Sequence, residues 1–157
     1  MKINKTVIGV VGTLLIMWAA WVSSEKANAE GLYVELGKTI LNSDMTTHGL
    51  GFRKGSWGAA IEATGQGTTK RGDQSVQPLL SVYHVTDPNW IVLGVRIKTI
   101  LGVAYTPKQN LVGPTNFRLE FVFEVKGGLE FYARHYSSAG LHKPNTGVDT
   151  LGIRKLF

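Results

Sequence analysis

Apolar and polar residues alternate along several segments of the chain, and a period of two is typical of β-strands with one apolar face. The pattern is clearest at residues 116–126, where polar and charged residues occupy one face and only Val122 interrupts them. The other face of this segment is apolar throughout, with Phe117, Leu119, Phe121, Phe123 and Val125. Segments 90–105 and 128–138 alternate in the same way. No helical periodicity of useful length follows residue 29, so the pattern indicates an all-β fold.

Eight strands account for this alternation. We predict them at residues 31–40, 45–53, 56–65, 78–86, 90–105, 116–126, 128–138 and 147–157. Three connections are tight turns with Gly, Pro, Asn or charged residues, at 53–56, 87–89 and 126–128. They alternate with longer links at 65–77, 106–115 and 138–147, and with a shorter one near 41–45. Short turns on one side and longer loops on the other are typical of outer-membrane barrels.

Two architectures share such alternation. A soluble barrel or sandwich buries the apolar face, whereas a transmembrane barrel turns it toward lipid and packs the polar face inside. In the second case opposite charges can pair inside, namely Arg118, Arg134 and Arg154 with Glu120, Glu124 and Glu130. The alternation of turn lengths, and a chain that ends on Phe157, favour the membrane protein. We therefore predict an eight-stranded antiparallel transmembrane β-barrel with both chain ends on the periplasmic side.

Residues 1–29 have the three parts of a secretory signal peptide. These are a pair of lysines, an apolar core and an Ala-Asn-Ala cleavage site, at residues 2 and 5, 7–22 and 27–29. A membrane-anchoring helix is the alternative, but an apolar core of sixteen residues is short for a membrane span. We expect cleavage after Ala29, which leaves a single domain, the outer-membrane β-barrel at residues 30–157.

Composition excludes several kinds of site. The chain has no cysteine, so neither a disulfide nor a thiolate metal site can form. The four histidines do not fall at a metal-ligand spacing, and we expect no metal and no cofactor. Cleavage of the signal peptide would remove three lysines and one glutamate, which reduces the formal net charge from +6 to +4. This mild basic excess suits an anionic surface, and we expect no nucleic-acid partner.

His135 and Ser137 lie at the end of a predicted strand, and Asp149 follows them beyond a loop that contains Pro, Asn and Gly. Residues two apart on a strand point to the same face, and an antiparallel reversal of the chain returns Asp149 beside them. The three side chains then match the nucleophile, the base and the orienting acid of a serine hydrolase. The alternative interpretation is ordinary turn chemistry at the end of a strand.

The barrel topology places these three residues at the extracellular ends of their strands. By strand parity, His135 and Ser137 share the apolar face of Phe131. Asp149 shares the apolar face of Leu151, so all three side chains should point toward lipid. Polar groups on a lipid-facing surface cost free energy, so their presence there indicates a function. The pattern therefore predicts an enzyme that acts on an acyl chain held in the membrane.

The sequence His-Tyr-Ser-Ser-Ala-Gly-Leu at 135–141, followed by Pro144, Asn145 and Gly147, resembles the active-site signature of the lipid A 3-O-deacylase (PagL) family. The close match covers residues 134–150. The resemblance implies an eight-stranded bacterial outer-membrane barrel that hydrolyses the ester-linked 3-hydroxyacyl chain of lipid A, the membrane anchor of lipopolysaccharide, in the outer leaflet. It implies lipid A and outer-membrane lipids as partners and no cofactor. A homodimer stays open as one form of assembly.

Matched by position, the resemblance also implies a role for each site residue. Ser137 is similar to the family nucleophile and His135 to its general base, while Asp149 stands where the family usually has glutamate. The residues implied for the oxyanion hole are Asn145, Gly140 and Ser138. Ser138 departs from the family pattern, which generally has asparagine at this position. A hydroxyl can also donate a hydrogen bond, but its reach is shorter than that of an amide.

Two other functions fit the same pattern. One is a non-catalytic eight-stranded outer-membrane barrel with a structural or adhesion role, in which the triad has lost its activity. The other is a soluble periplasmic binder similar to a lipocalin. Basic residues in the outward loops could contact lipid A phosphates or simply be solvated: Lys70, Arg71, Lys108, His142 and Lys143. Aromatic residues near strand ends are expected at the membrane interfaces or in the lumen: Trp57, Trp90, Tyr105 and Tyr136.

Overall fold

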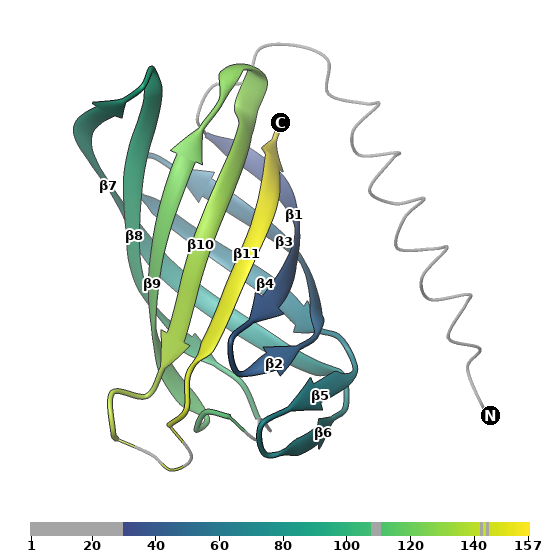
Figure 1. Cartoon of the computed structure of the whole chain (residues 1–157). Helices are drawn as coiled ribbons and strands as arrows, with labels where there is room; N and C mark the ends of the chain where they lie inside the picture. Colours follow the sequence, from purple (N-terminus) through teal and green to yellow (C-terminus); the bar gives the residue numbers. More distant parts are fainter. Residues whose placement is uncertain (1–29, 108–110, 142, 144) are drawn as a thin grey trace.

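The structure is a computed structural model that describes residues 30–107, 111–141, 143 and 145–157, so the expected signal peptide lies outside the described residues. Long antiparallel strands form one closed barrel in the order β1-β11-β10-β9-β8-β7-β4-β3 (Figure 1). These strands are β1 (Gly31–Ile40), β3 (Thr46–Lys54), β4 (Trp57–Thr64), β7 (Gln77–Val92), β8 (Val95–Tyr105), β9 (Thr115–Glu124), β10 (Leu129–Ser137) and β11 (Val148–Leu156). The predicted eight-stranded antiparallel barrel is therefore confirmed.

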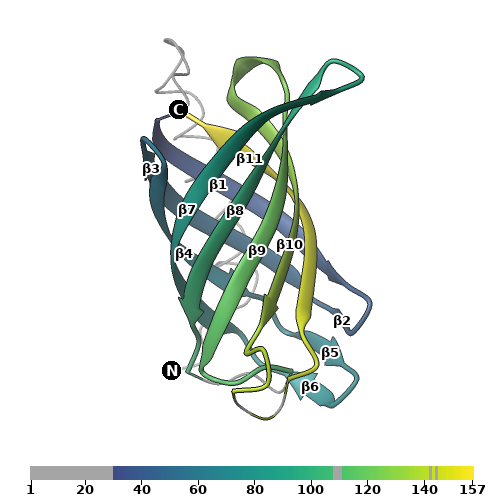
Figure 2. The ribbon, with the colours of Figure 1, turned by 90° about the vertical axis from the view of Figure 1, so that its left-hand side faces the viewer.

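The two ends of the barrel differ in the length of their connections (Figures 1 and 2). At the short-turn end, the short 3₁₀ segment η1 (Lys126–Gly128) joins β9 to β10. The pairing of β1 with β11 along their length closes the barrel. At the long-loop end, a separate sheet forms within two of the predicted links. We call it the loop sheet, and its strands are β2 (Ser43–Asp44), β5 (Gly67–Thr69) and β6 (Gly72–Gln74).

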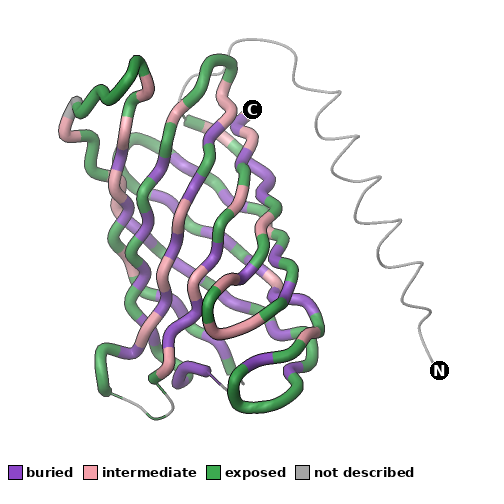
Figure 3. Tube along the Cα trace, viewed as in Figure 1, coloured by how far each residue is buried: buried purple, intermediate pink, exposed green. Residues whose placement is uncertain are grey.

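Burial alternates along the barrel strands, and the charged residues lie inside (Figure 3). In β9, for example, Phe117 and Phe121 are exposed on the outer surface, whereas Arg118 and Glu120 are buried in the lumen. An apolar exterior around a charged interior is the arrangement of a transmembrane barrel, because lipid rather than water contacts the outer face. This excludes the soluble architecture that the alternation alone left open. Among the described residues no helix is long and apolar enough to cross a membrane.

The middle of the lumen is filled by four arginines and four glutamates. Their ion pairs have N···O distances of 2.5–3.1 Å, and the residues are Arg53, Arg118, Arg134, Arg154, Glu35, Glu62, Glu120 and Glu130. Buried charges are tolerated only when they are paired in this way. The prediction that inward charges pair is confirmed, although Glu124 lies nearer the rim, where it pairs with Lys98 at 3.0 Å.

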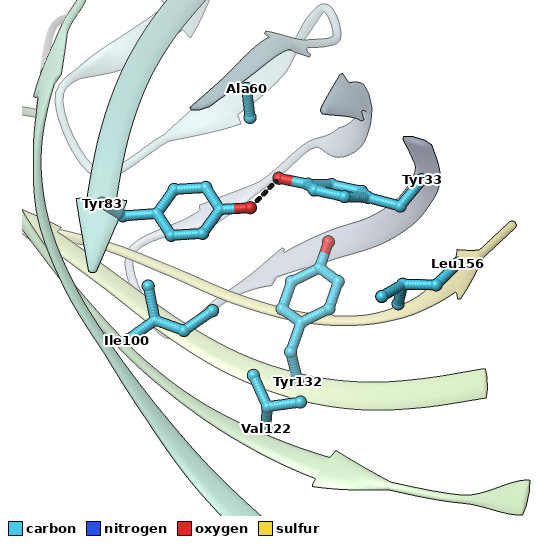
Figure 4. Packing of buried hydrophobic residues seen from close by; sticks show 7 residues of the cluster. All are labelled: Tyr33, Ala60, Tyr83, Ile100, Val122, Tyr132 and Leu156. Carbon is cyan, nitrogen blue, oxygen red and sulfur yellow. Dashed lines mark hydrogen bonds between the residues drawn. The ribbon is translucent and has the colours of Figure 1, made fainter. Parts of the chain in front are cut away.

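Three buried tyrosines, Tyr33, Tyr83 and Tyr132, belong to one cluster in the lumen (Figure 4), and each of their rings lies beside an arginine of the charged layer. The hydroxyl of Tyr83 donates to the hydroxyl of Tyr33 at 2.9 Å. The guanidinium of Arg134 lies 4.4 Å from the ring centre of Tyr132, a favourable cation–π distance. Side chains therefore fill the lumen at this level, as they do in other barrels of eight strands.

The prediction of a tight turn at residues 87–89 is wrong. Strand β7 continues through this segment to Val92, across a bulge between Thr86 and Trp90. The chain reverses instead at Leu93 and Gly94, whose φ angles of 51° and 79° suit a two-residue type I′ hairpin turn. A bulge accommodates the proline of the predicted turn, because proline has no N–H to contribute to the ladder.

Buried loop residues close the barrel at its long-loop end. Leu111 and Val112, which lie between β8 and β9, pack against Tyr136 and Val148 inside the mouth of the barrel. Tyr136 is therefore a lumen residue. The other aromatic residues expected near strand ends are exposed on the outer surface, as an interfacial position requires: Trp57, Trp90 and Tyr105.

Candidate active site

Strands β10 and β11 place His135 directly opposite Asp149 in their antiparallel register. The Nδ1 atom of His135 lies 2.7 Å from Oδ1 of Asp149. An ionised carboxylate can only accept a hydrogen bond, so Nδ1–H must be the donor. This arrangement leaves the lone pair of Nε2 on the other side of the ring, where it can accept a proton.

Ser137 is the last residue of β10 and shares the outer face with His135. Neither side chain is buried in the lumen, and the imidazole is 43% exposed while the Asp149 carboxyl group is 23% exposed. Within the described part of the chain, no hydrogen bond joins the Ser137 hydroxyl to His135. Such contacts are often long in unliganded enzymes and shorten when substrate binds. The three residues of the expected triad are thus on neighbouring strand positions of one lipid-facing surface.

The chain turns sharply just after Ser137. The N–H of Leu141 donates to the carbonyl of Ser138 at 2.9 Å, and the φ angles of Ala139 and Gly140 are 49° and 85°. Two positive φ angles identify a type I′ turn, which favours glycine at its second central position. The N–H of Gly140 is not used by this turn, and it makes no hydrogen bond to any described residue. It remains available to a ligand.

Ser138 and Asn145 bind each other. The backbone N–H of Ser138 donates to Oδ1 of Asn145 at 2.8 Å, and the Ser138 hydroxyl donates to the same oxygen at 2.9 Å. A backbone N–H can only donate, so the atom facing it is the amide oxygen, and the amide NH₂ points elsewhere. Ser138 is fully buried, whereas Asn145 is exposed. This geometry makes Ser138 a support for Asn145 rather than a second exposed donor.

Gly147 contacts the edge of the His135 ring. A Cβ atom added to this glycine would lie 2.8 Å from Cε1 and 3.6 Å from each ring nitrogen of His135. Its φ angle of +86° also lies in the region that only glycine adopts without strain. Gly147 belongs to the motif matched in the sequence, but its contact with His135 could not be predicted there. A glycine in a loop does not indicate which side chain its backbone approaches.

The described residues of the site do not form a set of metal ligands. No group of three or more His, Asp or Glu side chains is arranged there to hold a metal ion. Catalysis at this site would depend on the hydroxyl, the imidazole, the carboxylate and the nearby amide donors.

A wide apolar hollow of about 1060 Å³ lies on the other side of the barrel from this site. It is centred on β4, which is four strands from β10 in either direction around the barrel. Its lining includes outward-facing side chains such as Leu50, Ile61 and Val82, and none of the predicted site residues is among the lining residues. We assign the chemistry to β10 and β11, because no described residue that lines the hollow is a histidine or has a carboxylate side chain that could activate a nucleophile.

A closed barrel with an apolar exterior, and with Ser, His and Asp together on that exterior near its long-loop end, defines a membrane-embedded hydrolase. The model of the family described as "Lipid A 3-O-deacylase (PagL)" matches residues 14–155, and the chain belongs to this family. No curated protein matches the sequence.

Among solved structures, the chain is similar to the "Crystal structure of the outer membrane enzyme PagL", with 21% sequence identity and a TM-score of 0.55. The similarity covers 80% of this chain and 99% of that chain. At this level of identity the match supports the barrel fold. The family match is independent of it and supports the expected class of enzyme, a lipid A 3-O-deacylase.

Proposed function

We propose that this member of the family hydrolyses the ester at position 3 of lipid A by a serine-hydrolase mechanism, with the chemistry on the lipid-facing surface of the barrel. The observation that carries the proposal is the hydrogen bond of 2.7 Å between His135 and Asp149, on the same outer face as Ser137. An acyl chain that lies in the membrane can reach this surface without leaving the lipid phase. The substrate class follows from the family.

In the first half of the reaction, the hydroxyl of Ser137 attacks the ester carbonyl carbon, and its proton moves to Nε2 of His135. The carbonyl oxygen becomes negatively charged in the tetrahedral intermediate. The N–H of Gly140 and the side-chain NH₂ of Asn145 donate hydrogen bonds to this oxygen. The C–O bond to the sugar then breaks, and His135 returns the proton to the departing sugar hydroxyl.

In the second half, water attacks the acyl-serine ester and gives a proton to His135. The second tetrahedral intermediate collapses, the bond to Ser137 breaks, and the serine oxygen recovers the proton. The free 3-hydroxy fatty acid leaves into the membrane. Asp149 keeps Nδ1 protonated and stabilises the imidazolium that forms in both halves.

Mass spectrometry of lipid A tests the proposed function directly. Lipid A from cells that make the protein should lose the mass of one 3-hydroxyacyl chain relative to cells that do not make it. The released fatty acid should be recovered in equal amount. A spectrum that is unchanged, although the folded protein is present in the membrane, would exclude this activity.

Asn145→Ala is expected to reduce kcat about 10²–10³-fold, because the loss of one oxyanion donor typically has this effect. Ser138→Ala should reduce kcat much less, since the backbone N–H of Ser138 still holds the Asn145 side chain. Release of radiolabelled fatty acid from lipid A in detergent micelles measures both. Equal losses in the two variants would show that the Ser138 hydroxyl is itself a donor in the transition state.

Gly147→Ala is expected to reduce kcat about 10–100-fold, because an added methyl group displaces the imidazole from its alignment with Ser137. Gly94→Ala is the matched control. Gly94 also has a positive φ, of +79°, but a Cβ atom there meets nothing within 4 Å. The control should have the same backbone strain and wild-type activity. Equal activity of both variants would remove the proposed contact with the ring from the mechanism.

We further propose that residues 1–29 direct export and are removed, and that the barrel resides in the outer membrane with its long-loop end outward. N-terminal sequencing of the mature protein should start at Glu30, and separation of inner from outer membranes should place it in the outer fraction. The homodimer stays a prediction, which sedimentation equilibrium in density-matched detergent can test.

A further inference from the structure

Thr146 lies between the two loop residues that contact the site, Asn145 and Gly147. Each of its polar groups is hydrogen-bonded to a different part of the chain. Its N–H donates to the carbonyl of Leu111 at 2.7 Å. Its carbonyl accepts from Nδ2 of Asn42 at 3.1 Å, and its hydroxyl accepts from Nε of Arg71 at 3.0 Å. We call these four residues, Asn42, Arg71, Leu111 and Thr146, the loop junction.

Two of the partners of Thr146, Leu111 and Asn42, are themselves held in place, whereas the hydrogen bond from Arg71 is exposed. Leu111 is completely buried in the mouth of the barrel. The carbonyl of Asn42 accepts a hydrogen bond from the N–H of Lys70 at 2.9 Å, so the link before β2 is tied to the turn that carries Arg71. Leu111 and the segments next to the loop sheet therefore form a frame around one threonine.

The loop between β10 and β11 needs such a frame. It contains no regular secondary structure in its described residues, yet it carries Asn145 and Gly147. Asn145 binds Ser138, and Gly147 contacts His135. A displacement of Thr146 moves both neighbours along the backbone. Misplacement of a catalytic group by about 1 Å can reduce a rate 10²-fold.

We propose that Arg71 and Asn42 are positioning residues for the deacylation. By holding Thr146 in place, they also hold the side-chain amide of Asn145 and the imidazole of His135. The inference rests on the proposed serine-hydrolase mechanism. It gives the loop sheet a function, since Arg71 lies between β5 and β6 and Asn42 directly precedes β2. Neither residue touches the reacting atoms.

Arg71 has a second interpretation, as a cation that attracts the phosphates of lipid A. The two interpretations predict different kinetics. A phosphate contact acts on substrate binding and should change KM, and neighbouring cations should share the effect. A positioning contact acts on the transition state and should change kcat. Lys70 provides the comparison, because it is an adjacent cation whose side chain takes no part in the loop junction.

The decisive variants are Arg71→Met and Thr146→Val, each of which removes one side of the same hydrogen bond. Each should reduce kcat about three- to tenfold with KM nearly unchanged, as expected for the loss of one hydrogen bond. The double variant should be no slower than either single variant, because both remove the same contact. Thr146→Ser keeps the hydroxyl and should restore wild-type kcat.

Lys70→Met is the matched control, since it removes one positive charge from the same turn and leaves the hydrogen bond intact. It should leave kcat unchanged. The wild type and Ser137→Ala are measured in the same lipid A micelle assay, so that a failure of the proposed mechanism is recognised separately. Wild-type kcat in both Arg71→Met and Thr146→Val, or an equal loss in Lys70→Met, would overturn the proposal.

An NMR measurement tests the positioning without any turnover. The side-chain amide signals of Asn145 and the Cε1–Hε1 signal of His135 report on the two groups that Thr146 is inferred to place. Both should shift in the full-length folded Arg71→Met and Thr146→Val proteins in micelles, and both should stay in place in Thr146→Ser and Lys70→Met. Unchanged signals in all four variants would contradict the inference even if the protein cleaved no ester.

Discussion

Replacing Ser137 by alanine is expected to abolish release of the 3-hydroxyacyl chain from lipid A while the barrel still folds. The variant removes the only group in the site that we assign to attack the ester. In serine hydrolases, loss of the nucleophile reduces kcat about 10⁶-fold, and a remainder of about 10³–10⁴ over water comes from binding and the oxyanion hole. Mass spectrometry of lipid A and fatty-acid release in micelles both measure this loss.

The control for Ser137→Ala is a measurement that shows that the variant barrel is folded. Ser137 faces outward at the end of β10, and its hydroxyl makes no hydrogen bond to any described residue. Its loss should therefore leave the migration of the folded and heated forms on a gel unchanged. His135→Ala should be equally inactive, because the proton of the serine then has no acceptor. Substantial acyl release by the folded Ser137→Ala protein would exclude Ser137 as the nucleophile.

Replacing Glu120 by alanine should strongly destabilise the folded barrel. Its carboxylate contacts three guanidinium groups, with N···O distances of 2.7, 2.5 and 2.7 Å to Arg118, Arg134 and Arg154. Removal of one member of a buried ion-pair network leaves uncompensated charges and typically costs about 3–5 kcal/mol. Urea unfolding in lipid vesicles, followed by tryptophan fluorescence, should show a free energy of unfolding that is lower by this amount.

Glu124→Ala is the matched control for the lumen. Glu124 also lies on β9 and also pairs with a cation, at 3.0 Å from Lys98, but its side chain is 28% exposed. Glu124→Ala leaves one cation without its partner, Lys98, whose side chain is 7% exposed, whereas Glu120→Ala leaves three such cations. The expected loss is therefore smaller than that of Glu120→Ala. If the two variants had the same free energy of unfolding, the buried network would contribute no more to stability than a pair at the rim.

The strands of the barrel were predictable because their alternation reflects a physical boundary. In β9 and β10, every second side chain contacts lipid and every other one contacts a charged lumen, so the sequence must alternate with a period of two. The same regularity puts His135, Ser137 and Asp149 on the outer face of their strands. For this reason the outward direction of the three expected triad residues could be predicted from the sequence.

The short turn near Pro88 could not be predicted from local sequence. Asp-Pro-Asn is strong turn chemistry, yet the ladder between β7 and β8 continues past it through a bulge. Whether the chain turns at Pro88 or continues as a strand depends on the free energy that further pairing of β7 with β8 contributes. Residues 90–92 pair with 95–97 beyond the bulge, and this pairing extends the hairpin. Pairing energy across a hairpin is a property of both strands, and the turn residues alone do not contain it.

The sequence by itself determined the closed barrel, the apolar exterior, and the His, Ser and Asp residues at positions 135, 137 and 149 that we propose as the triad, because alternation and motif spacing are local properties of the chain. Only the tertiary structure decided which loops support that site. Thr146 meets Asn42 and Arg71 across 104 and 75 positions of sequence. Contacts over such separations arise when the barrel closes and brings its loops to one end, and no local pattern records them.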